Sequence, residues 1–254
     1  MTAVAQGEPL FKLEDVTKSF GNLIAVQDVS FSVGRGEIVG LVGDNGAGKS
    51  TLMKLMNGFY APDTGAISFD SKPVRFSSPR DARNAGIETV YQDLALIPAL
   101  SLWRNFFLGR ELKKGRPPFR ILLKDQMRKI TMENMRTMGL TRLRSPEEPV
   151  DILSGGERQA LAIARARYFG GSLLLLDEPT SALSVKETEK VSEAVQIAKR
   201  DGLGVVIIDH NIGHVHRICD RIVIMETGRV IRSVQRDEIT AEQVADLVAG
   251  RHAL

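Results

Sequence analysis

Cysteine is almost absent from this sequence of 254 residues, since Cys219 is the only one. An internal disulfide bond is therefore excluded, and the composition suits a reducing compartment. Long hydrophobic runs are also missing, and none approaches the ~20 apolar residues that a membrane-spanning helix requires. Residues 1–8 lack both the basic end and the apolar core of a signal peptide. We expect a cytoplasmic protein whose connection to any membrane comes through a partner.

The sequence also lacks a strong excess of charge. The net charge is +3, a mild bias that does not by itself indicate a nucleic-acid partner. The hydrophobic content of 43% and the charged content of 26% are ordinary for a soluble globular protein. The length allows one large α/β domain, or one domain that carries a subdomain.

The most informative stretch is residues 43–51, which match the phosphate-loop pattern G-x-x-x-x-G-K-[ST] at every required position. Its glycines let backbone N–H groups turn toward an anion without obstruction from a Cβ atom. An apolar run predicts a strand before the loop, and helical spacing follows it, so a phosphate would lie at a helix N-terminus. Lys49 would supply charge for the β- and γ-phosphates, and the Ser50 hydroxyl would ligate Mg²⁺. The candidate nucleotide-binding residues are Gly43, Asp44, Asn45, Gly46, Ala47, Gly48, Lys49, Ser50 and Thr51.

Two kinds of strand pattern predict two sheets. Residues 11–14 and 29–33 alternate between apolar and polar, as half-exposed antiparallel strands do. Residues 173–176 and 205–208 are short and continuously apolar, which is typical of central parallel strands covered on both faces. We therefore predict an α/β fold with a mainly parallel central sheet and an antiparallel layer near the N-terminus.

Strand signals disappear between residues 94 and 150. Residues 121–139 have apolar side chains at roughly helical spacing, and we interpret their methionines as core packing. The basic stretch 113–118, with its glycine and prolines, is predicted to be a solvated loop. We predict a single domain over residues 1–254, with an α/β core formed by 1–93 and 166–254 and an inserted helical subdomain formed by 94–165.

A buried strand that ends in two carboxylates carries the second motif. Residues 173–176 are all leucine, and Asp177 and Glu178 follow them. Because adjacent strand residues point to opposite sides, the two carboxylates should have separate duties. Asp177 fits the group that orients Mg²⁺, and Glu178 is then free to polarise a water molecule. The alternative is a polar strand end without a role, but functional groups collect at the carboxyl ends of parallel strands.

The Leu-Ser-Gly-Gly-Glu sequence at residues 153–157 precedes a predicted helix. Ser154 and Glu157 have the spacing of an ordinary capping box. Gly155 and Gly156 argue against that interpretation, because they weaken a first helical turn yet let a phosphate approach bare N–H groups. A chain with two phosphate-binding helix starts would use the second one on a neighbouring molecule's nucleotide.

In order and spacing, the phosphate loop, residues 153–157 and residues 173–179 resemble ABC transporter ATPase domains, and the similarity covers nearly the whole chain. The resemblance implies a head-to-tail dimer with two ATP molecules between opposed phosphate loops and signature helices. It also implies that Gln92 senses Mg²⁺ and the γ-phosphate, that Phe20 stacks on adenine, and that His210 is the switch histidine beside the γ-phosphate.

Other interpretations of these residues stay open. Without the remaining motifs, Gln92 would be an ordinary loop glutamine and Phe20 a core residue. His210 and His214 have the i,i+4 spacing of a metal-binding pair, but no further cysteine or acidic ligand is spaced to complete such a site.

One position departs from the family pattern, because Ser184 stands where the family has aspartate. Serine and aspartate are both good N-cap residues, and Ser184 with Glu187 has capping-box spacing. We expect the local helix start to survive. The change puts in doubt the charged contact across the dimer that the aspartate supports.

The resemblance implies an ATP-hydrolysing subunit of an ABC importer, in which ATP closes the dimer and hydrolysis reopens it. Residues 90–96 and 103–105 resemble the ATPases of bacterial simple-sugar importers of the ribose, xylose and fructose type. The implied partners are transmembrane permease subunits, a second ATPase subunit and, indirectly, a periplasmic or extracellular solute-binding protein. The implied location is the inner face of the cell membrane, and no nucleic-acid partner is expected.

Three alternatives remain. The importer could carry a substrate other than a sugar. A soluble ABC-type ATPase acting on ribosomes or DNA usually has tandem ATPase domains or a long coiled-coil insertion, and this sequence has neither. A phosphate-loop kinase or GTPase would leave residues 153–157 unexplained, and the sequence lacks the Asn-Lys-x-Asp motif that reads guanine.

Overall fold

The structure, a computed structural model, describes residues 8–116 and 118–251. Its strands are β1 (Phe11–Phe20), β2 (Leu23–Val33), β3 (Ile38–Gly43), β4 (Thr64–Phe69), β5 (Lys72–Pro73), β6 (Ile87–Val90), β7 (Lys113–Lys114), β8 (Ile121–Leu122), β9 (Leu173–Asp177), β10 (Gly204–Ile208), β11 (Arg221–Glu226) and β12 (Arg229–Gln235). Its α-helices are α1 (Lys49–Met56), α2 (Pro79–Ala85), α3 (Leu102–Phe107), α4 (Lys124–Thr137), α5 (Gly155–Tyr168), α6 (Val185–Arg200), α7 (Ile212–Ile218) and α8 (Ala241–Val248), and short 3-10 helices span Val150–Ile152 and Arg236–Glu238. None of the described helices is long and apolar enough to cross a membrane. The expectation about a signal peptide concerns residues 1–8, of which residues 1–7 lie outside the described residues.

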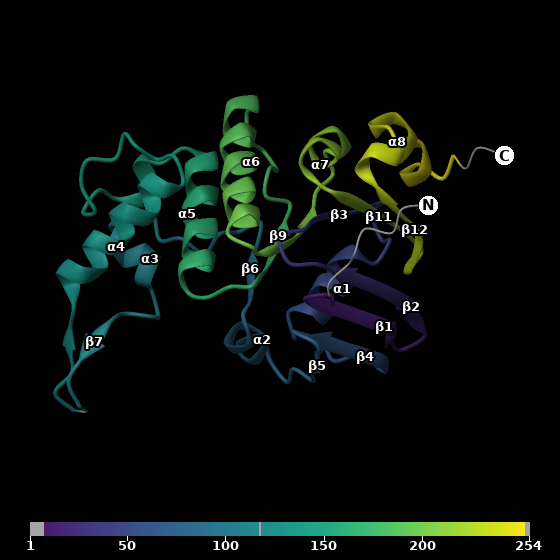
Figure 1. The fold of residues 1–254 in the computed structure, drawn as a ribbon, viewed down its shortest axis with the longest axis horizontal. Coiled ribbons are helices and arrows are strands. Elements are labelled where there is room, and N and C mark those ends of the chain that lie inside the picture. The colour runs from purple at the N-terminus through teal and green to yellow at the C-terminus, as the bar shows by residue number, and fades with distance from the viewer. Residues whose placement is uncertain (1–7, 117, 252–254) are drawn as a thin grey trace.

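Six of the described strands form the central sheet, in the order β12-β11-β3-β10-β9-β6. Neighbouring strands in it pair in parallel, except for the antiparallel hairpin of β11 and β12. A second, antiparallel sheet has the order β2-β1-β4-β5 and lies beneath the central sheet in the view of Figure 1. The predicted fold class is therefore confirmed.

The continuously apolar strands lie at the centre because both of their faces are covered. In β9, the side chains of Leu174 and Leu176 pack with the helices on one face of the sheet. Leu173 and Leu175 pack with α1 and the antiparallel sheet on the other. Burial on both faces explains why this strand shows no alternation of apolar and polar residues.

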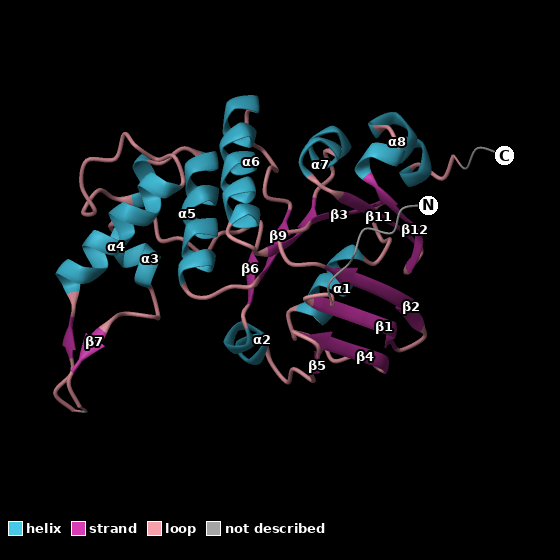
Figure 2. Cartoon of the chain, viewed as in Figure 1, coloured by secondary structure: helices cyan, strands magenta, loops and turns pink. Residues whose placement is uncertain are grey.

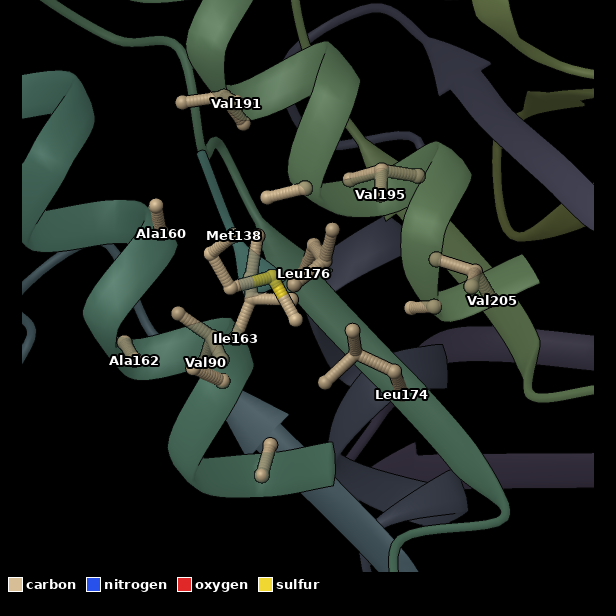
Figure 3. Packing of buried hydrophobic residues seen from close by; sticks show 14 of the residues in the cluster. Val90, Met138, Ala160, Ala162, Ile163, Leu174, Leu176, Val191, Val195 and Val205 are labelled. Atoms are coloured by element: carbon tan, nitrogen blue, oxygen red, sulfur yellow. The ribbon is translucent and has the colours of Figure 1, made fainter. Parts of the chain in front are cut away.

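Helices α5 and α6 cover one face of the central sheet side by side. Figure 3 shows Ile163 of α5 and Val195 of α6 directed toward Leu174 and Leu176. The four side chains are fully buried. This packing fixes both helices relative to β9, whose carboxyl end carries the acidic pair.

Helices α3 and α4 lie at the opposite end of the molecule from the antiparallel sheet (Figure 2). Met127 and Met135 of α4 are fully buried, as expected of core methionines. The predicted basic loop is wrong in part, because Lys113–Lys114 and Ile121–Leu122 pair as a short antiparallel hairpin. Strands of two residues are too short to show any alternation in the sequence. The limits of the inserted helical subdomain stay a prediction.

Candidate active site

The loop between β3 and α1 depends on glycine at two positions. Gly46 and Gly48 adopt left-handed backbone conformations, with φ angles of 81° and 98°. A Cβ atom at Gly48 would also lie 2.5 Å from the carbonyl oxygen of Ala25. Helix α1 begins directly after this loop, so its first backbone N–H groups lack helical partners and remain available to an anion.

The Lys49 side chain is hydrogen-bonded to the backbone of the phosphate loop. It is buried, and Nζ donates to the carbonyl oxygens of Gly43 at 2.7 Å and Asp44 at 2.9 Å. Burial lowers the pKa of Lys49, and the nearby carboxylates of Glu178, Asp44 and Asp177 oppose that shift. The ammonium group is thus held close to the acidic pair that follows β9.

The other residues of the loop differ in exposure. Asp44, Asn45, Gly46 and Ser50 are exposed, whereas Ala47 is buried. Thr51 is half-buried in the first turn of α1. A surface pocket beside the loop is lined by Val42, Gly43, Asp44, Asn45, Asp209, His210, Ile212 and Val248. The phosphate loop and His210 therefore share one hollow.

The ends of β9 and β10 bring the predicted catalytic residues together. Asp177 pairs in register with Ile208, so the residues that follow each strand emerge side by side, as the two buried runs predict. Glu178 Oε1 lies 2.5 Å from His210 Nε2. Glu178 has a left-handed φ of 48°, and its backbone N–H donates to the Ile208 carbonyl oxygen at 2.7 Å. Such a conformation costs a non-glycine residue on the order of 1 kcal/mol and clusters at functional sites.

Asp177 occupies an unfavourable position for a lone carboxylate. Burial raises its pKa, and the adjacent Glu178 raises it further, while Lys54, His210 and Lys49 act in the opposite direction. A bound cation would relieve this repulsion. Mg²⁺ prefers oxygen ligands and needs only one or two from the protein when phosphates supply others, so the carboxylate of Asp177 and the hydroxyl of Ser50 fit it. No group of three or more His, Cys, Asp or Glu side chains in the described residues would hold a metal alone.

Gln92 and Phe20 lie at the borders of this site. Gln92 is exposed just after β6, and its Nε2 donates to Ser181 Oγ at 3.4 Å rather than to a group of the acidic pair. Phe20 ends β1 with 41% of its surface exposed, and its ring meets that of Tyr60 edge to face at 5.0 Å. The exposed ring surface suits stacking, and the roles of both residues stay predictions.

Residues Ser154–Glu157 start helix α5, away from the phosphate loop. Figure 1 places α5 and α1 on opposite sides of β9, and among the described residues no hydrogen bond or ion pair joins these two helix starts. The capping box that the glycines argued against does form. The Ser154 N–H donates to Glu157 Oε2 at 2.9 Å, and the Glu157 N–H donates to Ser154 Oγ at 3.4 Å.

Gly155 and Gly156 have a packing reason that the sequence did not reveal. A Cβ atom at Gly156 would lie 2.5 Å from the backbone carbonyl oxygen of Glu187, and one at Gly155 would lie 2.5 Å from Leu183 Cδ2. The two glycines therefore let α5 approach the start of α6 closely. A phosphate-binding role for them is compatible with this packing and stays a prediction.

The start of α6 forms as expected despite Ser184. Glu187 Oε2 accepts the Ser184 N–H at 3.0 Å and the Ser184 hydroxyl at 2.8 Å. The other carboxylate oxygen of Glu187 accepts the Gly155 N–H at 2.8 Å. One side chain thus caps α6 and ties it to the start of α5.

Sequence reasoning missed a buried hydrogen bond close to the acidic pair. Thr180 donates its hydroxyl proton to Asp209 Oδ2 at 2.5 Å. His214 is also buried, with Nε2 2.9 Å from Ser192 Oγ, so it does not form a pair with the exposed His210. The only sign of the Thr180–Asp209 contact in the sequence was that Asp209 directly precedes His210.

Comparison with known proteins gives consistent results. Residues 26–181 match the family model described as ABC transporter. The chain is 44% identical to the xylose/arabinose import ATP-binding protein of Sulfolobus acidocaldarius, over 94% of this chain and 93% of that one. It is 41% identical to the fructose import ATP-binding protein of Rhizobium meliloti, over 96% and 95%. A ribose import ATP-binding protein of Rubrobacter xylanophilus is 37% identical over 96% of this chain but only 46% of its own length.

Solved structures agree with the fold. Part of an ABC transporter complex from Clostridium perfringens, cbiO1, has a TM-score of 0.79 and 27% identity, covering 96% of this chain and 97% of that one. A dimeric ATP-binding cassette bound to ADP and Pi has a TM-score of 0.72 and 27% identity, covering 89% and 98%.

The packing of α5 on α6 predicts that Gly156→Ala destabilises the protein. The new methyl group would meet rigid backbone, and overpacking of this kind costs about 1–3 kcal/mol. Gly213→Ala is the matched control, because its Cβ would lie no closer than 3.6 Å to another group and alanine is favoured in a helix. Denaturant unfolding should show a loss for Gly156→Ala only. Equal stability of the two variants would contradict the packing assignment.

Proposed function

This chain belongs to the ABC transporter family, and we propose that it is the ATP-hydrolysing subunit of an importer for a simple sugar. The observation that carries the proposal is the meeting of a phosphate loop, an acidic pair and a histidine at one edge of the central sheet. The sugar is supported by the names of two relatives that match over nearly their whole length, those for xylose/arabinose and for fructose.

The phosphate loop would hold the phosphates of ATP. The N–H groups at the start of α1 and the ammonium of Lys49 would face the β- and γ-phosphates. Ser50 and Asp177 would hold Mg²⁺, with Gln92 as a further ligand once it leaves Ser181. The cation would neutralise negative charge on the phosphates. Phe20 would stack on the adenine ring. Because stacking contacts only the face of the ring, it would not read the edge of the base.

Glu178 and His210 would carry out hydrolysis. Glu178 would accept a proton from water while the water oxygen attacks the γ-phosphorus and the bond to the ADP oxygen breaks. His210 contacts the Glu178 carboxylate and lies on the pocket that the phosphate loop shares, so it would hold Glu178 and face the γ-phosphate. Removal of such a base typically costs about 10²–10⁴-fold in rate.

A second copy of the chain would complete each nucleotide site. Residues Ser154, Gly155, Gly156 and Glu157 lie apart from the chain's own phosphate loop (Figure 1), so they would act on the ATP held by a partner subunit. Dimeric cassettes among the solved relatives support this arrangement. ATP would close the head-to-tail dimer, and hydrolysis would reopen it.

Membrane permease subunits would receive this motion at the inner face of the cell membrane. The import ATP-binding relatives support such partners, and a solute-binding protein would deliver the sugar to the permease. Gln92 and the helices that follow it would form the contact, because this glutamine joins the nucleotide site to α3. The import relatives do not favour the alternative of a soluble ATPase acting on ribosomes or DNA.

Lys49→Ala should weaken ATP binding about 10- to 100-fold, because a charged hydrogen-bond donor is lost. The exposed Lys72→Ala on β5 is the control and should bind ATP as the wild type does. Isothermal titration with MgATP measures both. Equal affinity for the two variants would refute the assignment of the loop.

Glu178→Gln should bind MgATP normally but lose about 10²–10⁴-fold in turnover, because an amide cannot serve as a base. ATP would then remain between two subunits and shift the equilibrium toward dimer. The exposed Glu189→Gln on α6 is the matched control. Phosphate release and size-exclusion chromatography with MgATP and with MgADP provide the readouts. A monomer in both, with turnover near wild type, would show that another residue acts as the base.

Cysteines placed on the proposed permease contact should cross-link to the permease subunit. Leu96 is half-buried and Arg104 is exposed, whereas Trp103 is buried and is unsuitable for labelling. Burial raises the pKa of the native Cys219 thiol, so it should stay unreactive. A cysteine at Lys72, on strand β5 of the antiparallel sheet, is the control. Capture of RNA or ribosomal protein from positions 96 and 104 would favour the soluble ATPase instead.

A further inference from the structure

A buried polar cluster lies next to the loop that follows the acidic pair. It consists of Thr180, Asp209 and His214, which have 7%, 5% and 1% of their surface exposed. Polar side chains are rarely buried this deeply unless they are hydrogen-bonded, because desolvation of a carboxylate is costly. The cluster therefore has a reason beyond filling space.

Asp209 accepts hydrogen bonds on both carboxylate oxygens. Oδ2 accepts the Thr180 hydroxyl at 2.5 Å, and Oδ1 accepts the Asn211 N–H at 3.0 Å. Burial acts to raise the pKa of Asp209, but the hydrogen bonds that it accepts from Thr180 and the Asn211 N–H act against burial, and the pKa lies below its usual value. The group is therefore an ionised carboxylate that uses both oxygens.

His214 anchors the cluster to helix α6. The Ser192 hydroxyl donates its only proton to the Thr188 carbonyl oxygen at 2.9 Å, so the His214 Nε2–H is the donor in its 2.9 Å contact with Ser192 Oγ. The other ring nitrogen, Nδ1, lies 3.7 Å from Asp209 Oδ2. The imidazole thus stands between the carboxylate and a long helix that is fixed to the sheet.

The position of this cluster in the sequence links it to hydrolysis. Thr180 lies two residues after Glu178, and Asp209 lies one residue before His210. Apart from the contact between Glu178 and His210 themselves, the two loops are joined by the backbone bond from Glu178 to Ile208 and by the Thr180–Asp209 bond. The Thr180–Asp209 hydrogen bond is the contact that a side-chain substitution can remove while leaving Glu178 and His210 unchanged.

We propose that Thr180 and Asp209 are a pair of positioning residues that hold Glu178 and His210 at the distance and orientation that hydrolysis requires. The inference rests on the roles proposed above for Glu178 and His210. Because Glu178 has a left-handed backbone, its carboxylate keeps its place only while the residues after it are fixed. A misplacement of a reacting group by about 1 Å can cost on the order of 10²-fold in rate.

Thr180→Val tests the pair, because valine keeps the shape of threonine and removes the hydroxyl. We expect kcat for ATP hydrolysis by the full chain to fall about 10- to 100-fold, with the KM for MgATP unchanged within about threefold. Thr180→Ser restores the hydroxyl and should recover most of the turnover. Thr131→Val removes another buried hydroxyl, on α4, and should hydrolyse ATP as the wild type does.

A double-mutant cycle with Asp209→Asn separates positioning from general damage. Thr180 and the Asn211 N–H donate to different carboxylate oxygens, and an amide has an acceptor at only one of these two positions, so it cannot keep both hydrogen bonds. Asp209→Asn should therefore also lower kcat. In the double variant, the loss should stay within about twofold of the larger single loss, as expected for residues that act as a unit. Losses that multiply would overturn the proposal.

The remaining outcomes separate this inference from the proposed function. If Glu178→Gln abolishes turnover while Thr180→Val keeps wild-type kcat, the positioning role is wrong and the proposed base stands. If Glu178→Gln retains turnover, the base is wrong, and the cycle still reports whether Thr180 and Asp209 are coupled. Should Thr180→Val fail to give a cooperative thermal unfolding transition, Asp209→Asn alone decides, and wild-type kcat in that variant would overturn the inference.

Discussion

The burial of the parallel strands β3, β10 and β9 on both faces is the constraint on which the rest of the structure depends. Strands covered in this way leave no room for polar side chains along their length, so functional groups can follow only at their ends. Because the strands are parallel, those ends meet at one edge of the sheet. The phosphate loop, the acidic pair and Asp209 with His210 all follow strands at this edge.

The groups collected there are individually unfavourable. Lys49 is buried, Asp177 lies beside a second carboxylate, and Glu178 has a left-handed backbone. Each state persists because rigid neighbours determine it, and the two that involve charge, at Lys49 and Asp177, would be eased by a charge from a bound ligand. In the proposed function, the phosphates would give Lys49 further anionic partners, and a divalent cation would offset the negative charge of Asp177 and Glu178. The edge of the sheet therefore suits the phosphates of a nucleotide, and the metal remains part of the proposed function.

Local patterns allowed the sequence to predict the parts that depend on a few consecutive residues. The phosphate loop, the buried strand of leucines and the Ser184 helix start are of this kind, and the structure contains the corresponding loop, strand and capping contacts. The contact between Thr180 and Asp209 was not predictable, because it joins residues 29 apart and depends on the register of β9 against β10. The packing of Gly156 on α6 likewise depends on how closely the two helices approach each other in the folded chain. The sequence alone therefore suggested phosphate binding at this glycine and gave no sign of the helix contact.

Helix α6 connects the two halves of the proposed catalytic machinery within one chain. Near its start, Glu187 accepts the Gly155 N–H of the segment that would face a partner's nucleotide. About a turn and a half further along, Ser192 contacts His214, which lies against Asp209 behind the chain's own acidic pair. A helix moves largely as a rigid unit, so a displacement at Gly155 must either be shared by Ser192 or break one of these contacts. In the proposed dimer, the state of the partner's nucleotide and the position of the chain's own Glu178 and His210 would therefore be joined by α6, which packs against the buried strand that carries the acidic pair.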